Sequence, residues 1–377
     1  MSECILPHLT SQQVVEDKSL LPKDWAFQFK DPTLAGFHLA VLELIRRTSS
    51  RLPQDVIDAL VRGRDAESPD SRAFNTLNDM VKNILLADGH VTPLCQDTGT
   101  IIFYVKHPTG LSQLALKHQI RQAVVEGTER VWLRPNCVES LSGKNTGTNL
   151  DPFAEGHPVI HFEEWDRPEL EVGLMLKGGG CENVGAQYRL PDVHLGAGRD
   201  ISGVRKCIID AVMKAQGQGC SPGILGVAIG GDRVTGYEHS KAMLMRTLGA
   251  PHPHAALTQL EADLTRDLNT LGIGPMGYGG KTTVLGLFID ELYRHPASFF
   301  VSVFSGYGCT VSLALDLCVW VSVGRLFGLF VFPVFVGGCG VSLRLSNSVL
   351  VPLVSPIRPV FLLSFGATVP LFCGVVF

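Results

Sequence analysis

The stretch Pro93-Leu-Cys-Gln-Asp-Thr-Gly-Thr100 brings a thiol, an amide, a carboxylate and a glycine turn together within a few residues. Apolar residues at helical spacing precede it between Phe74 and Leu85, and the apolar, aromatic run Ile101–Val105 that follows is typical of a strand. The reactive groups are therefore predicted to lie on a loop held between a helix and a strand. Loops in that position often carry binding or catalytic residues.

The rest of the first 303 residues continues this alternation of helices and short apolar runs. The clearest helix, Ser71–Leu86, is expected to stop at Asp88-Gly89, and Ile224–Ile229 is typical of a short buried strand. Further helices are predicted over Leu39–Arg46, Gln54–Arg62, Leu111–Arg130, Ser202–Gln216 and Leu257–Leu271. The predicted fold class is α/β, with mixed helices and sheet in an N-terminal domain.

Length and charge narrow the class of protein. A chain of 377 residues is long enough for two domains of roughly 100–200 residues each. The net charge is only −4 and no Lys/Arg cluster occurs, which argues against nucleic acid as a partner. Residues 1–30 lack the apolar core of a secretory signal, and the ten cysteines form no CxxC pair. A cytoplasmic protein with reduced thiols is expected.

The composition changes abruptly near residue 304. From Phe304 to Phe377 the chain is mostly Val, Leu, Phe, Gly, Ser and Cys, and its last lysine is Lys281. Charged residues in this tail are limited to Asp316, Arg325, Arg344 and Arg358. The predicted organisation is an N-terminal extension at 1–38, a catalytic domain at 39–303 and an atypical hydrophobic tail at 304–377 for which no fold is predicted.

Three interpretations compete for this tail: a membrane anchor, the buried core of a second domain, or a segment foreign to the natural fold. Leu326–Leu343 and Pro359–Phe377 just reach the roughly 17–20 residues that span a bilayer. Several prolines and the lack of flanking Lys/Arg clusters argue against an anchor, and no amphipathic elements could cover a soluble core. We favour the foreign segment, produced by a frameshift or a wrong gene model.

Glycine-rich loops punctuate the first 303 residues. They are Asn145-Thr-Gly-Thr-Asn149, Lys177-Gly-Gly-Gly180, Gly230-Gly231 and Gly272–Gly280. Successive amide N–H groups in such loops form anion-binding concavities, so a small anionic ligand such as a carboxylate is expected. A nucleotide is disfavoured, because Gly272-Ile-Gly-Pro-Met-Gly277 follows a helix rather than a strand, and Pro275 stands where a phosphate-binding loop ending at Lys281 needs glycine.

Six motifs taken in order closely resemble one family. They are Cys95-Gln-Asp-Thr-Gly99, Asn145–Asn149, Lys177–Gly180, Gly219-Cys-Ser-Pro-Gly223 with Gly230-Gly-Asp232, the run from Gly272 to Thr283, and Arg294-His-Pro-Ala-Ser298. This order resembles the iron-sulfur hydro-lyases that comprise class I fumarate hydratases and the L-tartrate dehydratase alpha subunit. The resemblance covers about Leu39 to Val303.

The resemblance implies a 4Fe-4S cluster held by three cysteine thiolates, with one iron open to the substrate. Soft thiolates select such a cluster over a hard ion. Position by position, Cys95 and Cys220 match cluster ligands. Catalytic roles are implied for Asp97 and His295. Substrate contacts are implied for Gln96, Arg134, Gly178 and Gly179, while Cys181 lies beside the glycine loop without matching a ligand position.

The chain departs from the family pattern after Val303. There the family continues into a cysteine that supplies the third cluster ligand, but Tyr307 occupies the matching position here. Cys309, two residues further on, is a third ligand only if the loop rearranges. The chain also has no match to the family's second, swivelling domain. Either a separate beta subunit completes the site, or the chain is a defective product.

The predicted function is hydration of a small dicarboxylate, fumarate to malate, by an enzyme that is impaired as written. An L-tartrate dehydratase alpha subunit is the alternative within the family, and fumarate is preferred because Pro296–Val303 looks more like fumarases. An inactive or membrane-tethered remnant is the alternative of another class. A homodimer and a beta subunit both stay open as partners, and a membrane is disfavoured.

Overall fold

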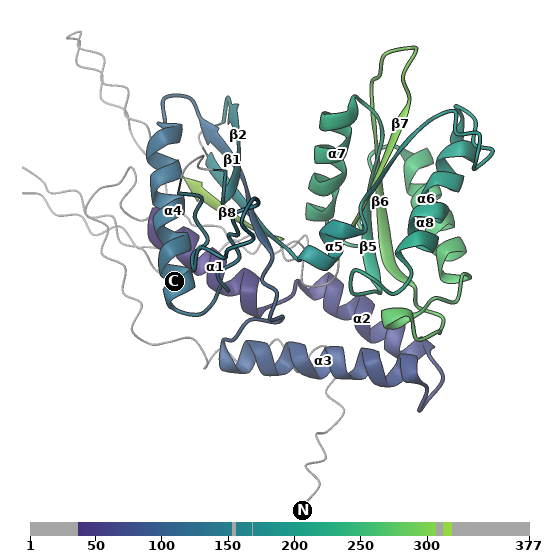
Figure 1. The fold of residues 1–377 in the computed structure, drawn as a ribbon, viewed down its shortest axis with the longest axis horizontal. Helices are drawn as coiled ribbons and strands as arrows, with labels where there is room; N and C mark the ends of the chain where they lie inside the picture. Colours follow the sequence, from purple (N-terminus) through teal and green to yellow (C-terminus); the bar gives the residue numbers. More distant parts are fainter. Residues whose placement is uncertain (1–36, 153–155, 168, 307–311, 319–377) are drawn as a thin grey trace, which may run out of the picture.

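Two four-stranded sheets form the framework of the protein, one in each of two lobes (Figure 1). The structure is a computed structural model that describes residues 37–152, 156–167, 169–306 and 312–318. The strand orders are β2-β1-β3-β8 in the first sheet and β4-β7-β5-β6 in the second. Helices flank both sheets, so the predicted α/β class with mixed helices and sheet is confirmed.

The first sheet is built around β1. It contains β1 (Thr100–Pro108), β2 (Val159–Trp165), β3 (Glu169–Lys177) and β8 (Ser312–Cys318). Strand β1 runs parallel to β2 and antiparallel to β3, which pairs antiparallel to β8. Helices α1 (Phe37–Ser50) and α4 (Gln113–Glu129) pack together beside this sheet. Apolar side chains such as Ile101 and Phe103, which are buried, form the core beneath them.

The second sheet is built around β5 (Gly223–Gly230), in which every residue is buried. Strand β5 runs parallel to β6 (Val284–Leu292) and antiparallel to β7 (Phe300–Gly306), whose other edge pairs with β4 (Ala186–Arg189). Its helices are α5 (Gly179–Asn183), α6 (Ile201–Ala215), α7 (Arg233–Ala242) and α8 (Ala255–Asn269), with short 3-10 turns η2 (Met243–Met245) and η3 (Pro275–Gly277). Helix α7 covers one face, and α6 and α8 cover the other (Figure 1).

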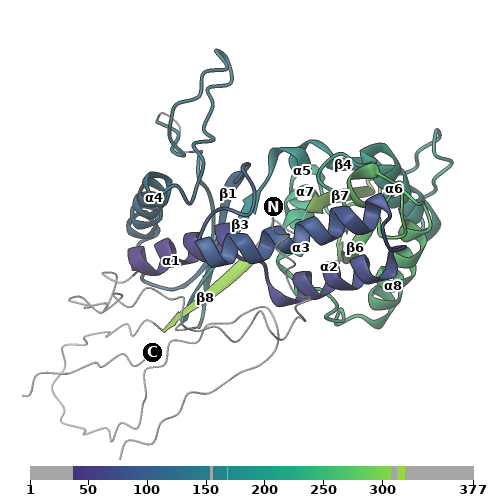
Figure 2. The ribbon, with the colours of Figure 1, turned by 90° about the horizontal axis from the view of Figure 1, so that it is seen from below.

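Helices α2 (Gln54–Ala66) and α3 (Arg72–His90) run along the base of the molecule, where α3 passes beneath both lobes (Figures 1 and 2). Ser71 caps α3 by accepting a hydrogen bond from the Phe74 amide at 3.0 Å. The predicted stop at Asp88-Gly89 is wrong, because α3 continues to His90. Its last turn is held by burial of Ala87 in the core, which outweighs the modest cost of a glycine within a helix.

The described backbone continues across the predicted domain boundary at residue 303. Strand β7 runs to Gly306, and the Phe304 side chain is fully buried in the core. The boundary itself stays a prediction. Cys309 and the two long apolar stretches of the tail lie outside the described residues. Within the described part of the chain, none of the helices combines the length and the apolar character needed to cross a membrane.

Candidate functional site

The loop Cys95–Gly99 docks against the glycine-rich loop Lys177–Gly180 at the end of β3, which we call the glycine loop. Gly99 has a φ of +74°, and a Cβ added there would lie 2.2 Å from the Lys177 carbonyl, so the turn needs glycine. Asp97 joins the two loops, since its Oδ1 accepts from the Gly99 amide at 2.9 Å and its Oδ2 accepts from the Gly179 amide at 2.8 Å. The structure thus brings together Cys95, Asp97 and Gly179.

Substitution of Gly99 by alanine is expected to destabilise the chain by about 2–4 kcal/mol, because the new methyl meets backbone at a left-handed φ. The matched control is Gly89→Ala, in α3, where an added Cβ has no atom within 4 Å. That control is expected to raise stability by up to about 1 kcal/mol. Urea unfolding measures both, and equal midpoints for the two variants would contradict the proposed docking of the loops.

Two polar side chains, Thr98 and Asn149, hold the backbone of Arg134 next to the same loop. Its backbone N–H donates to Thr98 Oγ1 at 3.0 Å, and its carbonyl accepts from Asn149 Nδ2 at 2.9 Å. Both Thr98 and Asn149 are buried, so they fix the Arg134 backbone while its guanidinium stays exposed and donates to the Gln96 carbonyl at 3.4 Å. Sequence reasoning missed these two supports, although both lie within the quoted motifs.

Cys220 lies in the turn that leads into β5. It adopts a φ of 61°, which is uncommon for a side chain other than glycine and is typical of strained functional positions. Neighbouring contacts hold the turn, because Ser221 Oγ donates to the Gly274 carbonyl at 3.0 Å and the Ser221 carbonyl accepts from the Met276 amide at 2.9 Å. The Cys181 thiol, at the start of α5, donates to the Gly219 carbonyl at 2.9 Å.

These contacts place three thiols in one neighbourhood. Burial raises the pKa of the Cys220 thiol, the negative charges that Cys181, Cys95 and Asp97 can carry raise it further, and Lys177 opposes them. Cys95 Sγ accepts from the Asp97 amide at 3.4 Å. A thiol with a raised pKa stays protonated near neutrality, so a bound cation is needed to bring out its thiolate.

The donor set suits a soft metal group rather than a hard cation, because its members are thiols. No set of three or more His, Cys, Asp or Glu side chains among the described residues is arranged to hold a single metal ion. Two of the three cysteines that the resemblance implies as ligands, Cys95 and Cys220, nevertheless lie near enough for the charge of one to affect the other. The chemistry of these donors is compatible with the iron-sulfur group that the resemblance implies.

His295 is not part of this neighbourhood. Cys220 precedes the first residue of β5, whereas His295 follows Leu292, which pairs with the last residue of β5. Strand β5 therefore separates the two by roughly 23 Å at about 3.3 Å per residue. His295 is exposed, and its Nδ1 accepts from the Ala297 amide at 3.1 Å. Its catalytic role stays a prediction that this chain's own thiol neighbourhood does not support.

The amide of Gly179 is already engaged by Asp97, so its predicted substrate contact requires Asp97 to release it. Gly179 and Gly180 are exposed, as are Gln96 and Arg134, and the loop therefore opens to solvent on the side where the substrate contacts were predicted. These roles stay predictions. Cys309, which is a third ligand only if its loop rearranges, lies outside the described residues.

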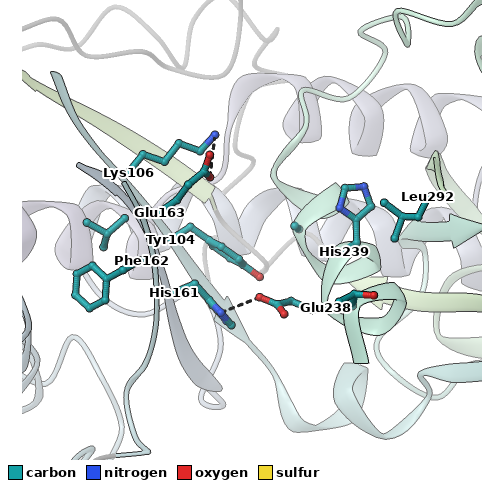
Figure 3. Close-up of a pocket in the computed structure, with 11 residues that line it drawn as sticks. Tyr104, Lys106, His161, Phe162, Glu163, Glu238, His239 and Leu292 are labelled. Carbon is teal, nitrogen blue, oxygen red and sulfur yellow. Dashed lines mark ion pairs between the residues drawn. The ribbon is translucent and has the colours of Figure 1, made fainter. Parts of the chain in front are cut away.

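A separate cavity of about 370 Å³ lies between the two lobes (Figure 3). Tyr104 and His161 stack on one wall with ring centroids 5.0 Å apart, and His161 Nδ1 contacts Glu238 Oε1 of α7 at 2.9 Å on the other. Burial, followed by Glu238 and Glu182, raises the pKa of Tyr104 to about 12. This cavity holds no thiol and lies further along β1 than the loop Cys95–Gly99.

Comparison with known proteins agrees with the motifs. The model of the fumarate hydratase (Fumerase) family matches residues 38–312. A Geobacillus stearothermophilus protein named for class I fumarate hydratase is 46% identical over 290 residues, which cover 76% of this chain and 55% of that protein. The chain thus spans about half the length of that relative.

Two further relatives are named for the alpha subunit of L(+)-tartrate dehydratase. The one from Methanocaldococcus jannaschii is 33% identical over 269 residues, covering 70% of this chain and 91% of its own. The one from Escherichia coli K12 is 33% identical over 261 residues, covering 68% and 83%. With the family match spanning both lobes, the chain belongs to the fumarate hydratase (Fumerase) family.

Proposed function

We propose that this chain is the cluster-binding half of a hydro-lyase that reversibly adds water to fumarate to form malate. The observation that carries the proposal is the proximity of Cys95 and Cys220, near enough for the charge of one to affect the other, beside an exposed glycine loop and the Arg134 guanidinium. A dicarboxylate needs cationic or N–H donors for its two charged ends, and both kinds are offered here. The family match supports the same class of reaction.

Arg134 and Asp97 have different proposed roles toward the substrate. The exposed, planar guanidinium of Arg134 suits one carboxylate of the substrate in two parallel hydrogen bonds. Asp97 holds the Cys95–Gly99 loop onto Gly179, and its remaining lone pairs can accept a proton from a substrate lying on that loop. The hydrogen bonds with Thr98 and Asn149 hold the Arg134 backbone in place, and this helps to orient a bound substrate relative to Asp97.

Cys95 and Cys220 would hold a 4Fe-4S cluster, and this cluster supplies a Lewis acid that is strong enough to activate hydroxide for the double bond. The third thiolate ligand is missing at the expected position, because Tyr307 stands where the resemblance implies a cysteine. We therefore propose that cluster binding is impaired in the chain as written. A 4Fe-4S group held by two thiolates is expected to be lost readily.

A second polypeptide is the proposed partner. Both tartrate dehydratase relatives are alpha subunits by name, and this chain covers most of their length. A beta subunit would supply the further cationic groups that close over the exposed loop. L-tartrate dehydration is the second candidate function, supported by the same relatives, since tartrate also presents two carboxylates to similar loops.

Anaerobic reconstitution of the full chain with iron and sulfide tests the proposal. Iron and sulfide per chain and absorbance in the iron-sulfur band are measured first, followed by turnover of fumarate, malate and L-tartrate with and without a candidate beta subunit. Turnover of fumarate above that of tartrate supports the proposal. Equal failure of cluster binding in the wild-type chain and in Tyr307→Cys would refute it.

Arg134→Met, introduced into the reconstituted Tyr307→Cys chain, is expected to raise the KM for fumarate by about 10- to 100-fold, because a bidentate contact to a carboxylate is lost. Arg134→Lys should recover only part of this loss, since an ammonium cannot reproduce the planar fork. The control is Arg130→Met, an exposed arginine close in sequence that pairs with Glu126. If Arg130→Met raises the KM as much, Arg134 is not the carboxylate contact.

A further inference from the structure

Lys177 is a fully buried lysine, with no exposed surface, at the end of β3 where the glycine loop begins. Its ammonium lies 4.5 Å from the ring centroid of Phe304 and donates to the carbonyl of Ser305 in β7. Lysine is almost never fully buried unless its charge is compensated. The structure therefore raises the question of what balances this charge.

A second lysine crowds the same ring without balancing the first. Lys241 Nζ lies 4.7 Å from the Phe304 centroid and binds Glu182 Oε1 at 2.5 Å. Two ammonium groups thus face one carboxylate, which leaves about one positive charge in a buried position. Burial is the main reason that the pKa of Lys177 falls to about 8, and Lys241 lowers it too, so most Lys177 side chains are still charged near neutral pH.

The Lys177 ammonium lies at the same end of the second sheet as Cys220, because the Ser305 carbonyl that accepts from it belongs to a residue that pairs with Leu225, near the start of β5. Besides Glu182, the groups whose negative charge favours the charged form of Lys177 are the thiols of Cys181 and Cys220. Cysteine ligands bind a metal group as thiolates, so the bound group brings negative charge to this neighbourhood. A group held there would therefore compensate the positive charge of Lys177.

A purely structural role explains less. The hydrogen bond from Lys177 to Ser305 ties β3 to β7, but a single bond to a carbonyl does not need a charged donor. An apolar side chain of the same length would fill the space against Phe304 without the desolvation cost of an ammonium. The charge itself thus calls for a function.

We infer that Lys177 is the counter-charge for the anionic metal group held by the Cys95 and Cys220 thiolates, and that Lys241 and Glu182 set its strength. Lys177 is a positioning residue that stabilises the bound group from behind the glycine loop and does not touch the substrate. This inference rests on the proposed function and adds to it a residue that holds the cofactor.

The test uses the full chain, as wild type and as Tyr307→Cys, reconstituted anaerobically. Lys177→Met removes the charge at nearly constant volume. The matched control is Lys106→Met, because Lys106 also lies over an aromatic ring, at 5.7 Å from the centroid of Trp165, but roughly 20 Å further along the sheet. Three quantities are measured: the urea midpoint of the metal-free chain, the rate of iron loss to a chelator, and the reduction potential of the cluster.

Lys177→Met is expected to raise the urea midpoint of the metal-free chain, to speed iron loss at least about tenfold and to shift the reduction potential to a more negative value. Glu182→Gln removes a negative charge and should shift the potential the other way, so it decides the matter if Lys177→Met does not fold. Lys106→Met should leave all three quantities unchanged.

Two results overturn the inference. If Lys177→Met keeps iron and potential as in its parent, or loses stability without any change in iron retention, the lysine is structural and the proposed function survives. If neither parent chain assembles a cluster, the proposed function fails and the inference fails with it. The two failures are distinguished by the parent chains alone.

Discussion

The Tyr307→Cys substitution is expected to raise the iron and sulfide retained by this chain from a small fraction to nearly one cluster per chain. Strand β7 ends at Gly306, which pairs with Ile224 of β5. Cys220 precedes β5 by a few residues. Residue 307 therefore follows directly on the end of β7 that lies beside Cys220. A thiol introduced there completes the three donors that the resemblance implies, and metal binding requires such deprotonated ligands.

The gain is measured by iron and sulfide analysis after anaerobic reconstitution and desalting, and then by hydration of fumarate. Tyr293→Cys is the matched control, since Tyr293 is a fully exposed tyrosine that follows β6 at the opposite end of the same sheet. That control should bind no more iron than the wild type. Equal gains from the two substitutions would mean that any added thiol binds iron nonspecifically and would refute position 307 as a ligand position.

Cys220→Ser, introduced into the Tyr307→Cys chain, is expected to abolish the cluster. A serine hydroxyl keeps the size of the side chain but cannot act as a soft, anionic donor to iron near neutral pH. The left-handed turn at Cys220 should persist, because Ser221 and its contacts with Gly274 and Met276 hold it. The expected loss exceeds tenfold in iron per chain, with the folded structure retained by circular dichroism. Cys95→Ser should give the same result.

Cys318→Ser provides the matched control for thiol loss. Cys318 pairs with Glu169 in the sheet, at the end of β3 opposite to Lys177, and so it lies roughly 25 Å from the glycine loop. Iron content should stay at the parental level. Equal loss of iron from Cys318→Ser and Cys220→Ser would show that the thiols act through general stability, and the ligand assignment would be withdrawn.

Local pattern was enough to predict most of the long helices and two of the buried strands. Apolar spacing fixed α1, α2, α4, α6 and α8 to within a few residues, and the runs Ile101–Val105 and Ile224–Ile229 became the centres of β1 and β5. Strands β2, β3 and β4 were not predicted. Their place depends on pairing with distant partners, since β3 lies between β1 and β8 and β4 pairs with β7.

The candidate site also combines features that local motifs indicate with features that depend on distant contacts. The resemblance that the motifs carry singled out Cys95, Asp97, Arg134 and Cys220 as candidate site residues, and their roles stay predictions. The contacts that support the site could not be predicted from local sequence. Thr98 and Asn149 hold the Arg134 backbone, and each carboxylate oxygen of Asp97 accepts a hydrogen bond from a backbone amide. Such roles depend on partners up to 82 residues away in the chain.

Periodicity and short motifs are local properties of a chain, and they were enough to predict the α/β class and the family and to single out Cys95 and Cys220 as candidate ligands. Which of these groups lie together is a property of the tertiary structure. It brought Cys95 and Cys220 to one end of the second sheet and placed His295 at the other, and it buried Lys177 behind the glycine loop. Burial and proximity come from packing between distant segments, and those two quantities set the charge of a site.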